Sequence, residues 1–187
     1  MVAEVVQLNE SKQQIKRMRQ IFESQQAAYR NNPKPSAHER VANLKKLRAV
    51  VMDNMDRFVA SISADFSGRS ANETKLADIM PVIHSIDYSI KHIKDWMKPV
   101  KKKVSPLFQP ATARVEYQPL GVIGIIAPWN YTVNLSLGPL VAALSAGNRA
   151  MIKMSEFTPE TSLLMEELIE AAFDEDLVSV VNGDAEV

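Results

Sequence analysis

The 187-residue sequence contains no cysteine. Disulfides, thiolate metal sites and a cysteine nucleophile are therefore excluded within these residues. Histidine is scarce as well, and the sequence places no further ligand at metal spacing beside His84 and His92. We interpret these histidines as surface or helix-packing residues and expect no metal site. Acidic and basic side chains balance at 22 each, so no net charge favours a nucleic acid or an anionic membrane as a partner.

The sequence also lacks long apolar runs. No stretch approaches the roughly 20 apolar residues of a membrane-spanning helix, and the N-terminus has no basic segment followed by an apolar core. We therefore expect no membrane segment and a cytoplasmic location. With 46% hydrophobic and 24% charged residues, the composition is that of an ordinary globular protein. The length suits one domain, or one domain with an appendage.

The first half of the chain predicts amphipathic helices. Ser36 and Glu39 have the spacing of a capping box and open a helix whose apolar residues recur at steps of three and four. A later helix shows the same steps over three heptads, at Leu76, Ile79, Ile83, Ile86, Ile90, Ile93 and Met97. Pro81 removes a backbone donor from that helix. We therefore favour a kinked helix packed into a larger core over the alternative, an autonomous coiled coil.

A different pattern begins at Lys98. Four prolines and the run Lys101–Lys103 mark residues 99–119 as a non-helical connector, with the lysines in a solvated turn. Within it, Arg114–Tyr117 alternates polar and apolar side chains, which predicts a short, half-exposed strand.

From Gly121 onward, apolar runs alternate with helical segments. The three runs, each predicted to be a strand, are 122–127, 149–154 and 177–181, and the helices between them cover about 134–146 and the residues after Thr158. The first run is apolar on both sides, as a strand covered by helices on both faces should be. The fold class is therefore α/β, with N-terminal helices packed on an incomplete Rossmann-like βαβαβ parallel sheet and a short arm strand.

Polar residues follow all three predicted strands, and parallel strands bring such ends to one edge. Lys153 suits a phosphate or a ribose hydroxyl, and Glu156 can accept from ribose hydroxyls. Asn130 offers a neutral amide that can stabilise an oxyanion, and Gly183 allows close backbone approach to a ligand. Simpler alternatives exist. Asn130 caps a turn, its neighbour Trp129 fills the core, and Lys153 and Glu156 form a surface ion pair.

These residues are similar to motifs of the aldehyde dehydrogenase superfamily. Residues 117–187 resemble its N-terminal part, with Pro128-Trp129-Asn130 at a strand end and a Lys-x-x-Glu motif after the next strand. Residues 65–99 resemble the coniferyl aldehyde dehydrogenase group, which is related to the class 3 type. The resemblance implies NAD- or NADP-dependent oxidation of an aldehyde, coniferyl or another aromatic one, to the carboxylic acid.

The resemblance also implies roles for individual residues and regions. Asn130 would stabilise the oxyanion of the adduct between aldehyde and enzyme thiol. The cofactor-binding residues would be Ile126, Ala127, Trp129, Lys153, Glu156 and Gly183, with Lys153 and Glu156 on the adenosine ribose. Residues 1–98 would be the helical part of the cofactor domain, 99–119 the connector and oligomerisation arm, and 120–187 the first half of the NAD(P)-binding domain. The expected partners are the aldehyde, the cofactor and a second copy in a homo-oligomer, a dimer.

The sequence departs from the family pattern in what it lacks. The family's catalytic cysteine, its general-base glutamate and a glycine-rich turn lie further along the chain than Val187. We therefore expect an N-terminal fragment that is inactive alone, because no thiol is present to form the covalent adduct. Its first strand, 121–127, would have an unpaired apolar edge. The alternative is a non-catalytic interaction module that uses the helices and the arm.

Overall fold

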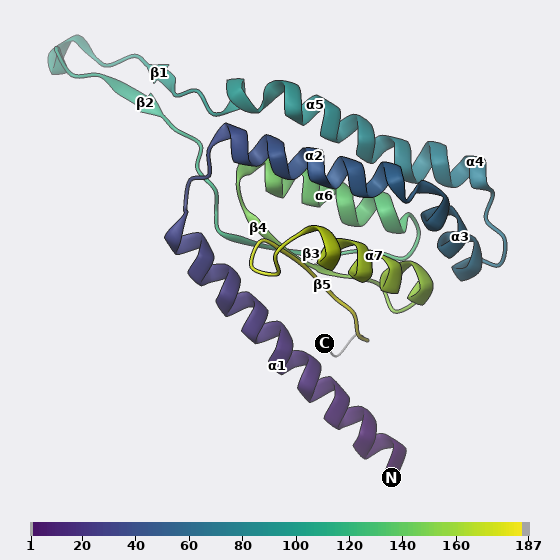
Figure 1. The fold of residues 1–187 in the computed structure, drawn as a ribbon. Helices are drawn as coiled ribbons and strands as arrows, with labels where there is room; N and C mark the ends of the chain where they lie inside the picture. Colours follow the sequence, from purple (N-terminus) through teal and green to yellow (C-terminus); the bar gives the residue numbers. More distant parts are fainter. Residues whose placement is uncertain (1, 185–187) are drawn as a thin grey trace.

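The computed structural model describes residues 2–184, with side chains from residue 12 onward. Figure 1 shows a three-stranded sheet with a stack of helices on one face and the long helix α1 (Val2–Asn31) on the other. Helices α6 (Thr132–Ala146) and α7 (Pro159–Ala172) cover the sheet directly. The outer helices, α2 (Ala37–Asp53), α3 (Met55–Asp65) and α5 (Met80–Trp96), pack on them.

The sheet confirms the predicted parallel β-α-β-α-β unit. Its strands are β3 (Val122–Ile126), β4 (Arg149–Lys153) and β5 (Val178–Val181), in the order β3-β4-β5. In the described residues β3 pairs only with β4, so its other edge is open. The expectation that helices cover both faces of β3 is wrong at its end, where Ile126 is 87% exposed.

Helix α2 begins as its capping box predicts. The Ser36 hydroxyl accepts from the Glu39 N–H at 3.2 Å, and the Glu39 carboxylate accepts from the Ser36 N–H at 2.7 Å. These bonds satisfy two donors that the helix cannot satisfy itself. The apolar side of α2, with Leu44, Leu47 and Val51, is fully buried.

The helix before Pro81 is interrupted, as predicted, but by a π-helical turn. The short α4 (Ala71–Glu73) leads into η1 (Thr74–Ile79), and α5 follows with Pro81 in its first turn. A π turn inserts an extra residue and shifts the phase of the helix. Leu76, expected in the core, is therefore 73% exposed, and Asp78 takes a fully buried position instead. From Ile79 on the predicted apolar face packs against α2 and α6, so the coiled-coil alternative is wrong. Ile79, Ile83, Ile86 and Ile93 are buried, and Ile90 and Met97 are partly buried.

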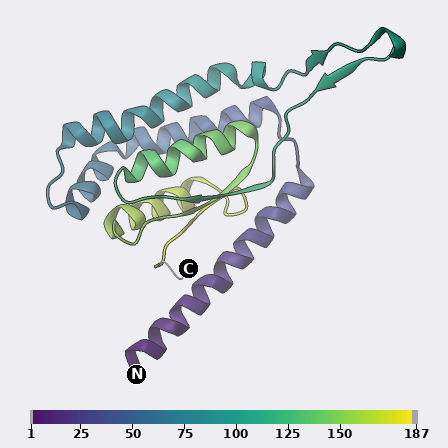
Figure 2. The same ribbon diagram turned by 180° about the vertical axis from the view of Figure 1, so that it is seen from behind.

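Helix α1 crosses the face of the sheet opposite to α6 and α7 (Figure 2). Gln25 is one of the polar residues that hold it there. The Gln25 amide, fully buried, donates to the carbonyls of Ala150 and Glu175 at 3.0 Å and lies 3.2 Å from the Ser179 hydroxyl. Buried backbone carbonyls of the sheet and its connecting loop thereby gain a donor from a helix distant in sequence.

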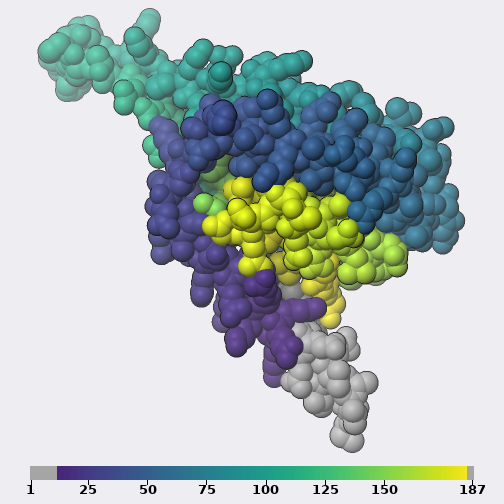
Figure 3. Space-filling model, in the orientation of Figure 1, coloured from purple at the N-terminus to yellow at the C-terminus, as the bar shows by residue number. Residues whose placement is uncertain are grey.

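The connector forms an antiparallel hairpin that projects from the body (Figures 1 and 3). Its strands are β1 (Val100–Lys102) and β2 (Ala113–Val115), with Lys101 opposite Arg114. The lysine run is therefore mainly strand rather than turn, because cross-strand pairing satisfies its backbone. A 3-10 turn, η2 (Pro106–Phe108), lies at the tip.

No helix in the described part of the chain has the length and apolarity needed to span a membrane.

Candidate functional site

The polar residues after the three strands meet at one edge of the sheet. The backbone N–H of Ala127 donates to the carbonyl of Lys153 at 2.9 Å, and the N–H of Met154 donates to the carbonyl of Val181 at 3.2 Å. The strand ends are therefore in hydrogen-bonded contact, and the residues that follow them start from adjacent positions. Parallel strand order produces this convergence, and open α/β sheets bind ligands at such an edge.

Lys153 links two of the strand ends. Its ammonium group donates to the carbonyls of Met154, at 2.9 Å, and of Gly183, at 2.8 Å. The same nitrogen lies 3.6 Å from a carboxylate oxygen of Glu156, whose side chain is partly exposed. The ion pair of the simpler alternative therefore exists, but Lys153 also ties the segment after β4 to the segment after β5. The edge thus presents a cation and a carboxylate side by side.

Asn130 lies in the tight loop between β3 and α6. Its carbonyl accepts from Nη1 of Arg69 at 2.8 Å. Its side-chain Oδ1 is buried and has no hydrogen-bond partner among the described residues. Helix α6 begins at Thr132 with Tyr131 at the N-cap, and the Asn130 side chain does not cap it. The simpler interpretation, in which Asn130 serves as a cap, therefore has no support in the hydrogen bonds of the loop.

Asp78 caps α6 from a distant part of the chain, and the sequence patterns above do not reveal it. Its Oδ1 accepts from the backbone N–H of Asn134 at 2.5 Å. Burial raises the pKa of Asp78 to about 6, although the N–H groups of Asn134 and Val133 and the charge of Arg69 favour the ionised form. The sequence contains only a weak signal for this cap. Tyrosine stands at the N-cap of α6 and cannot cap it, and an acidic residue lies beside the apolar face of an earlier helix.

Apolar groups complete the edge. Ile126, at the end of β3, and Trp129, which is 53% exposed, both face outward, so Trp129 is not simply a core residue. The Trp129 ring lies 6.4 Å from the ring of Phe66. Ala127 is buried and contributes its backbone to the contact with Lys153. The edge therefore combines exposed apolar side chains with the charged pair described above.

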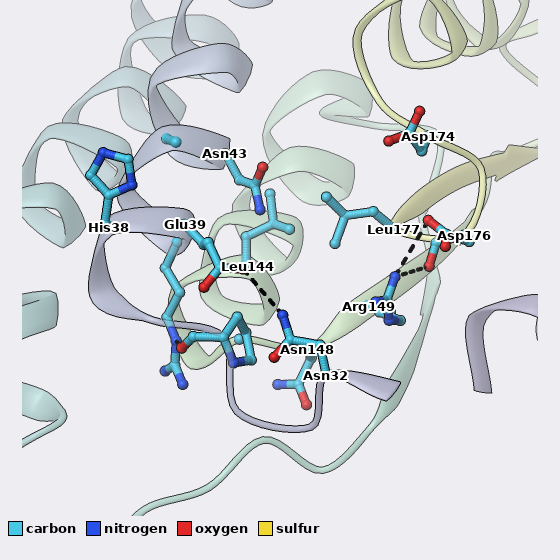
Figure 4. Close-up of a pocket in the computed structure, with 14 residues that line it drawn as sticks. Asn32, His38, Glu39, Asn43, Leu144, Asn148, Arg149, Asp174, Asp176 and Leu177 are labelled. Atoms are coloured by element: carbon cyan, nitrogen blue, oxygen red, sulfur yellow. Dashed lines mark hydrogen bonds and ion pairs between the residues drawn. The ribbon is translucent and has the colours of Figure 1, made fainter. Parts of the chain in front are cut away.

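A separate hollow of about 390 Å³ lies at the opposite edge, where β4 and β5 begin (Figure 4). None of the predicted site residues lines it. Its Arg149 pairs with Asp176, and its Glu39 belongs to the capping box of α2. Arg149 and Glu39 thus both have partners within the fold. Among residues 2–184, no cluster of three His, Cys, Asp or Glu side chains could hold a metal ion.

Comparison with known proteins gives concordant matches. Residues 3–187 match the model of the aldehyde dehydrogenase family. The probable coniferyl aldehyde dehydrogenase of Pseudomonas aeruginosa is 50% identical over 187 residues, which are 100% of this chain and 39% of that protein. The coniferyl aldehyde dehydrogenase of a Pseudomonas species is 45% identical over 148 residues, 79% of this chain and 30% of that protein.

The fold matches as well. A solved structure of Staphylococcus aureus AldH in a substrate-bound state has a TM-score of 0.87 and 28% identity. The superposition covers 90% of this chain and 37% of that one. The chain thus spans well under two thirds of the length of the relatives that it matches.

Proposed function

The chain belongs to the aldehyde dehydrogenase family, and we propose that it forms the oxyanion-stabilising and cofactor-binding edge of a site that oxidises an aldehyde with NAD or NADP. The observation that carries this proposal is the placement of the Lys153–Glu156 pair, 3.6 Å apart, at a strand end that adjoins the loop of Asn130. Topology alone brings these groups together from separate segments of the chain.

The chemistry of the strand edge fits a nicotinamide dinucleotide. A ribose diol needs acceptors and donors within reach. Glu156 offers carboxylate oxygens, and the Lys153 ammonium has a third hydrogen besides the two that it donates to the carbonyls of Met154 and Gly183. Ile126 and Trp129 are exposed apolar side chains that a planar ring could contact. We assign Gly183 to the adenine side, as the resemblance to the family implies, and its carbonyl accepts from the same ammonium group at 2.8 Å. The cofactor would supply the hydride acceptor.

The proposed role of Asn130 is to stabilise negative charge on the aldehyde oxygen. When a thiolate adds to the carbonyl carbon, a C–S bond forms and the carbonyl π electrons move to oxygen. A fixed amide N–H near that oxygen favours the adduct, and loss of one such donor typically costs about 100-fold to 1,000-fold in rate. The thiolate must come from outside these 187 residues, which contain no cysteine, so we expect the chain alone to be inactive.

Two finer features belong to the same proposal. The substrate would be an aromatic aldehyde of the coniferyl type, which the names of two similar proteins and the aromatic residues Phe66, Trp129 and Tyr131 at the edge support. The chain would also associate with a second copy through its hairpin, because Leu107 and Phe108 at the tip are 85% and 63% exposed. Apolar side chains so exposed favour contact with a partner.

Titration with NAD⁺ tests the cofactor site. The chain has two tryptophans, so a Trp96→Phe variant leaves Trp129 as the only tryptophan reporter. We expect saturable quenching of its fluorescence, and an affinity about tenfold weaker when Lys153→Met is added, because a charge-assisted contact is lost. Lys101→Met on the hairpin is the matched control and should leave the affinity unchanged. Absence of saturable quenching, or equal loss in both lysine variants, would contradict the proposal.

A further inference from the structure

The orientation of the Asn130 side chain depends on its backbone. The buried Oδ1 has no hydrogen-bond partner among the described residues, so no side-chain bond to the protein fixes the carboxamide through that atom. An amide that is to stabilise an oxyanion must be held in place before the charge develops. The contacts that hold the loop therefore decide whether the carboxamide is preorganised.

Arg69 holds the loop at Asn130 itself. Its Nη1 donates to the Asn130 carbonyl at 2.8 Å, a charge-assisted bond. The guanidinium carbon lies 3.8 Å from the centre of the Phe66 ring and 5.5 Å from that of Tyr131. Glu73 lies 3.9 Å away and balances the charge, and the arginine side chain is largely buried. Arg69 is thus itself fixed by a ring on each of two segments.

Asp78 holds the other end of the same loop. It accepts from the N–H of Asn134, four residues beyond Asn130, and replaces the local cap that Tyr131 cannot provide. The carboxylate is fully buried and comes from the π turn η1. Without that turn, the helix phase would place another side chain at this position. A π turn at such a place is frequently associated with a functional site.

We infer that Arg69 and Asp78 are positioning residues that hold the Asn130 carboxamide in the orientation needed for oxyanion stabilisation. This inference rests on the proposed role of Asn130. Neither residue contacts the reacting atoms in this role: Arg69 acts through the Asn130 carbonyl and Asp78 through the first turn of α6. Two residues that precede α5, one before α4 and one in η1, thereby position a side chain that follows β3.

The test measures the order of the Asn130 side chain by NMR, in the 187-residue chain without aldehyde or cofactor. The carboxamide signal is assigned by its disappearance in Asn130→Asp. In Arg69→Met and in Asp78→Leu we expect its heteronuclear NOE to fall toward that of the exposed Asn72. Asp78→Asn keeps an acceptor oxygen for the helix end and should restore the value of the unmodified chain.

Matched controls separate positioning from general destabilisation. Arg48→Met removes an ion pair of Arg48 with Asp87 at 2.8 Å, away from the loop. Asp65→Leu removes a carboxylate that caps α7 by accepting from the N–H groups of Glu160 and Thr161. Both controls should lower the melting temperature and leave the Asn130 signal unchanged.

Two results would overturn the inference: an unchanged Asn130 signal in Arg69→Met and Asp78→Leu, or an equal loss of order in the controls. If Asp78→Leu does not fold, Arg69→Met decides alone, because methionine is unbranched and retains much of the apolar volume of the arginine stem. Failure of the proposed function appears elsewhere, in the NAD⁺ titration, which can fail while Asn130 remains ordered by these contacts.

Discussion

Asp78→Asn provides a direct measure of the cost of burying a carboxylate at the start of α6. The carboxylate is fully buried, and one of its oxygens has no hydrogen-bond partner among the described residues. Asparagine has nearly the same shape, keeps an oxygen that can accept from the N–H of Asn134, and carries no charge. The substitution therefore removes the charge and retains the cap.

The sign and size follow from the pKa of Asp78. Burial raises it to about 6 in the folded chain, whereas an unfolded aspartate titrates near pH ~3.9. Between these values the folded state binds more protons, so the free energy of unfolding decreases as pH rises through the window and levels off above it. A difference of about 2 pKa units corresponds to about 3 kcal/mol.

Urea unfolding of both chains at pH 4, 5, 6 and 7 measures this effect. The free energy of unfolding of Asp78→Asn, minus that of the unmodified chain, should increase by about 2 kcal/mol from pH 4 to pH 7, because the unfolded aspartate is already about half ionised at pH 4. Other titrating groups occur in both chains and cancel in the difference, apart from any coupling through Arg69, whose charge faces Asp78. A difference that does not change with pH would refute the reasoning.

Further substitutions test other parts of the structure. In urea unfolding, Gly147→Ala should lower the free energy of unfolding by about 2 kcal/mol, because Gly147 has φ +85° and a Cβ there would lie 2.7 Å from the Arg40 guanidinium carbon. Gly68→Ala is the comparison: Gly68 has φ +112° but open space around it, so the same assay should show a loss of about 1 kcal/mol. Glu156→Gln should raise the affinity for NADP⁺ relative to NAD⁺ about tenfold in fluorescence titration, because a carboxylate repels the 2′-phosphate; an unchanged ratio would remove Glu156 from the ribose site. Phe108→Asp should shift a self-associated chain to monomer on size exclusion, and an unchanged elution volume would exclude the hairpin tip as the contact.

The sequence was sufficient for the features that depend on local periodicity and on topology. Apolar runs separated by helical segments predicted a parallel sheet, and parallel order requires that its strand ends meet. The approach of Lys153 and Glu156 to the loop of Asn130 follows from that rule alone. The capping box of Ser36 and Glu39 is a local pattern with one geometric solution, and the structure contains it.

These patterns did not predict the long-range contacts. The π turn places Asp78 in the core and Leu76 outside, because one inserted residue shifts the helix phase that a regular period assumes. Arg69 reaches a carbonyl 61 positions along the chain, and Gln25 reaches the sheet from α1. Such partners are brought together by tertiary packing, and no spacing in the sequence encodes them.

Mapping of NAD⁺ on the isotopically labelled 187-residue chain tests the central proposal most directly. On titration, we expect the largest chemical-shift changes at the Trp129 indole, at Lys153 and at Gly183, with saturation at one common affinity. The hollow at the opposite edge of the sheet, reported by Asn43 and Asp174, should remain unchanged (Figure 4). Shift changes confined to that hollow, or no saturable changes at the strand ends, would contradict the assignment of the cofactor-binding edge.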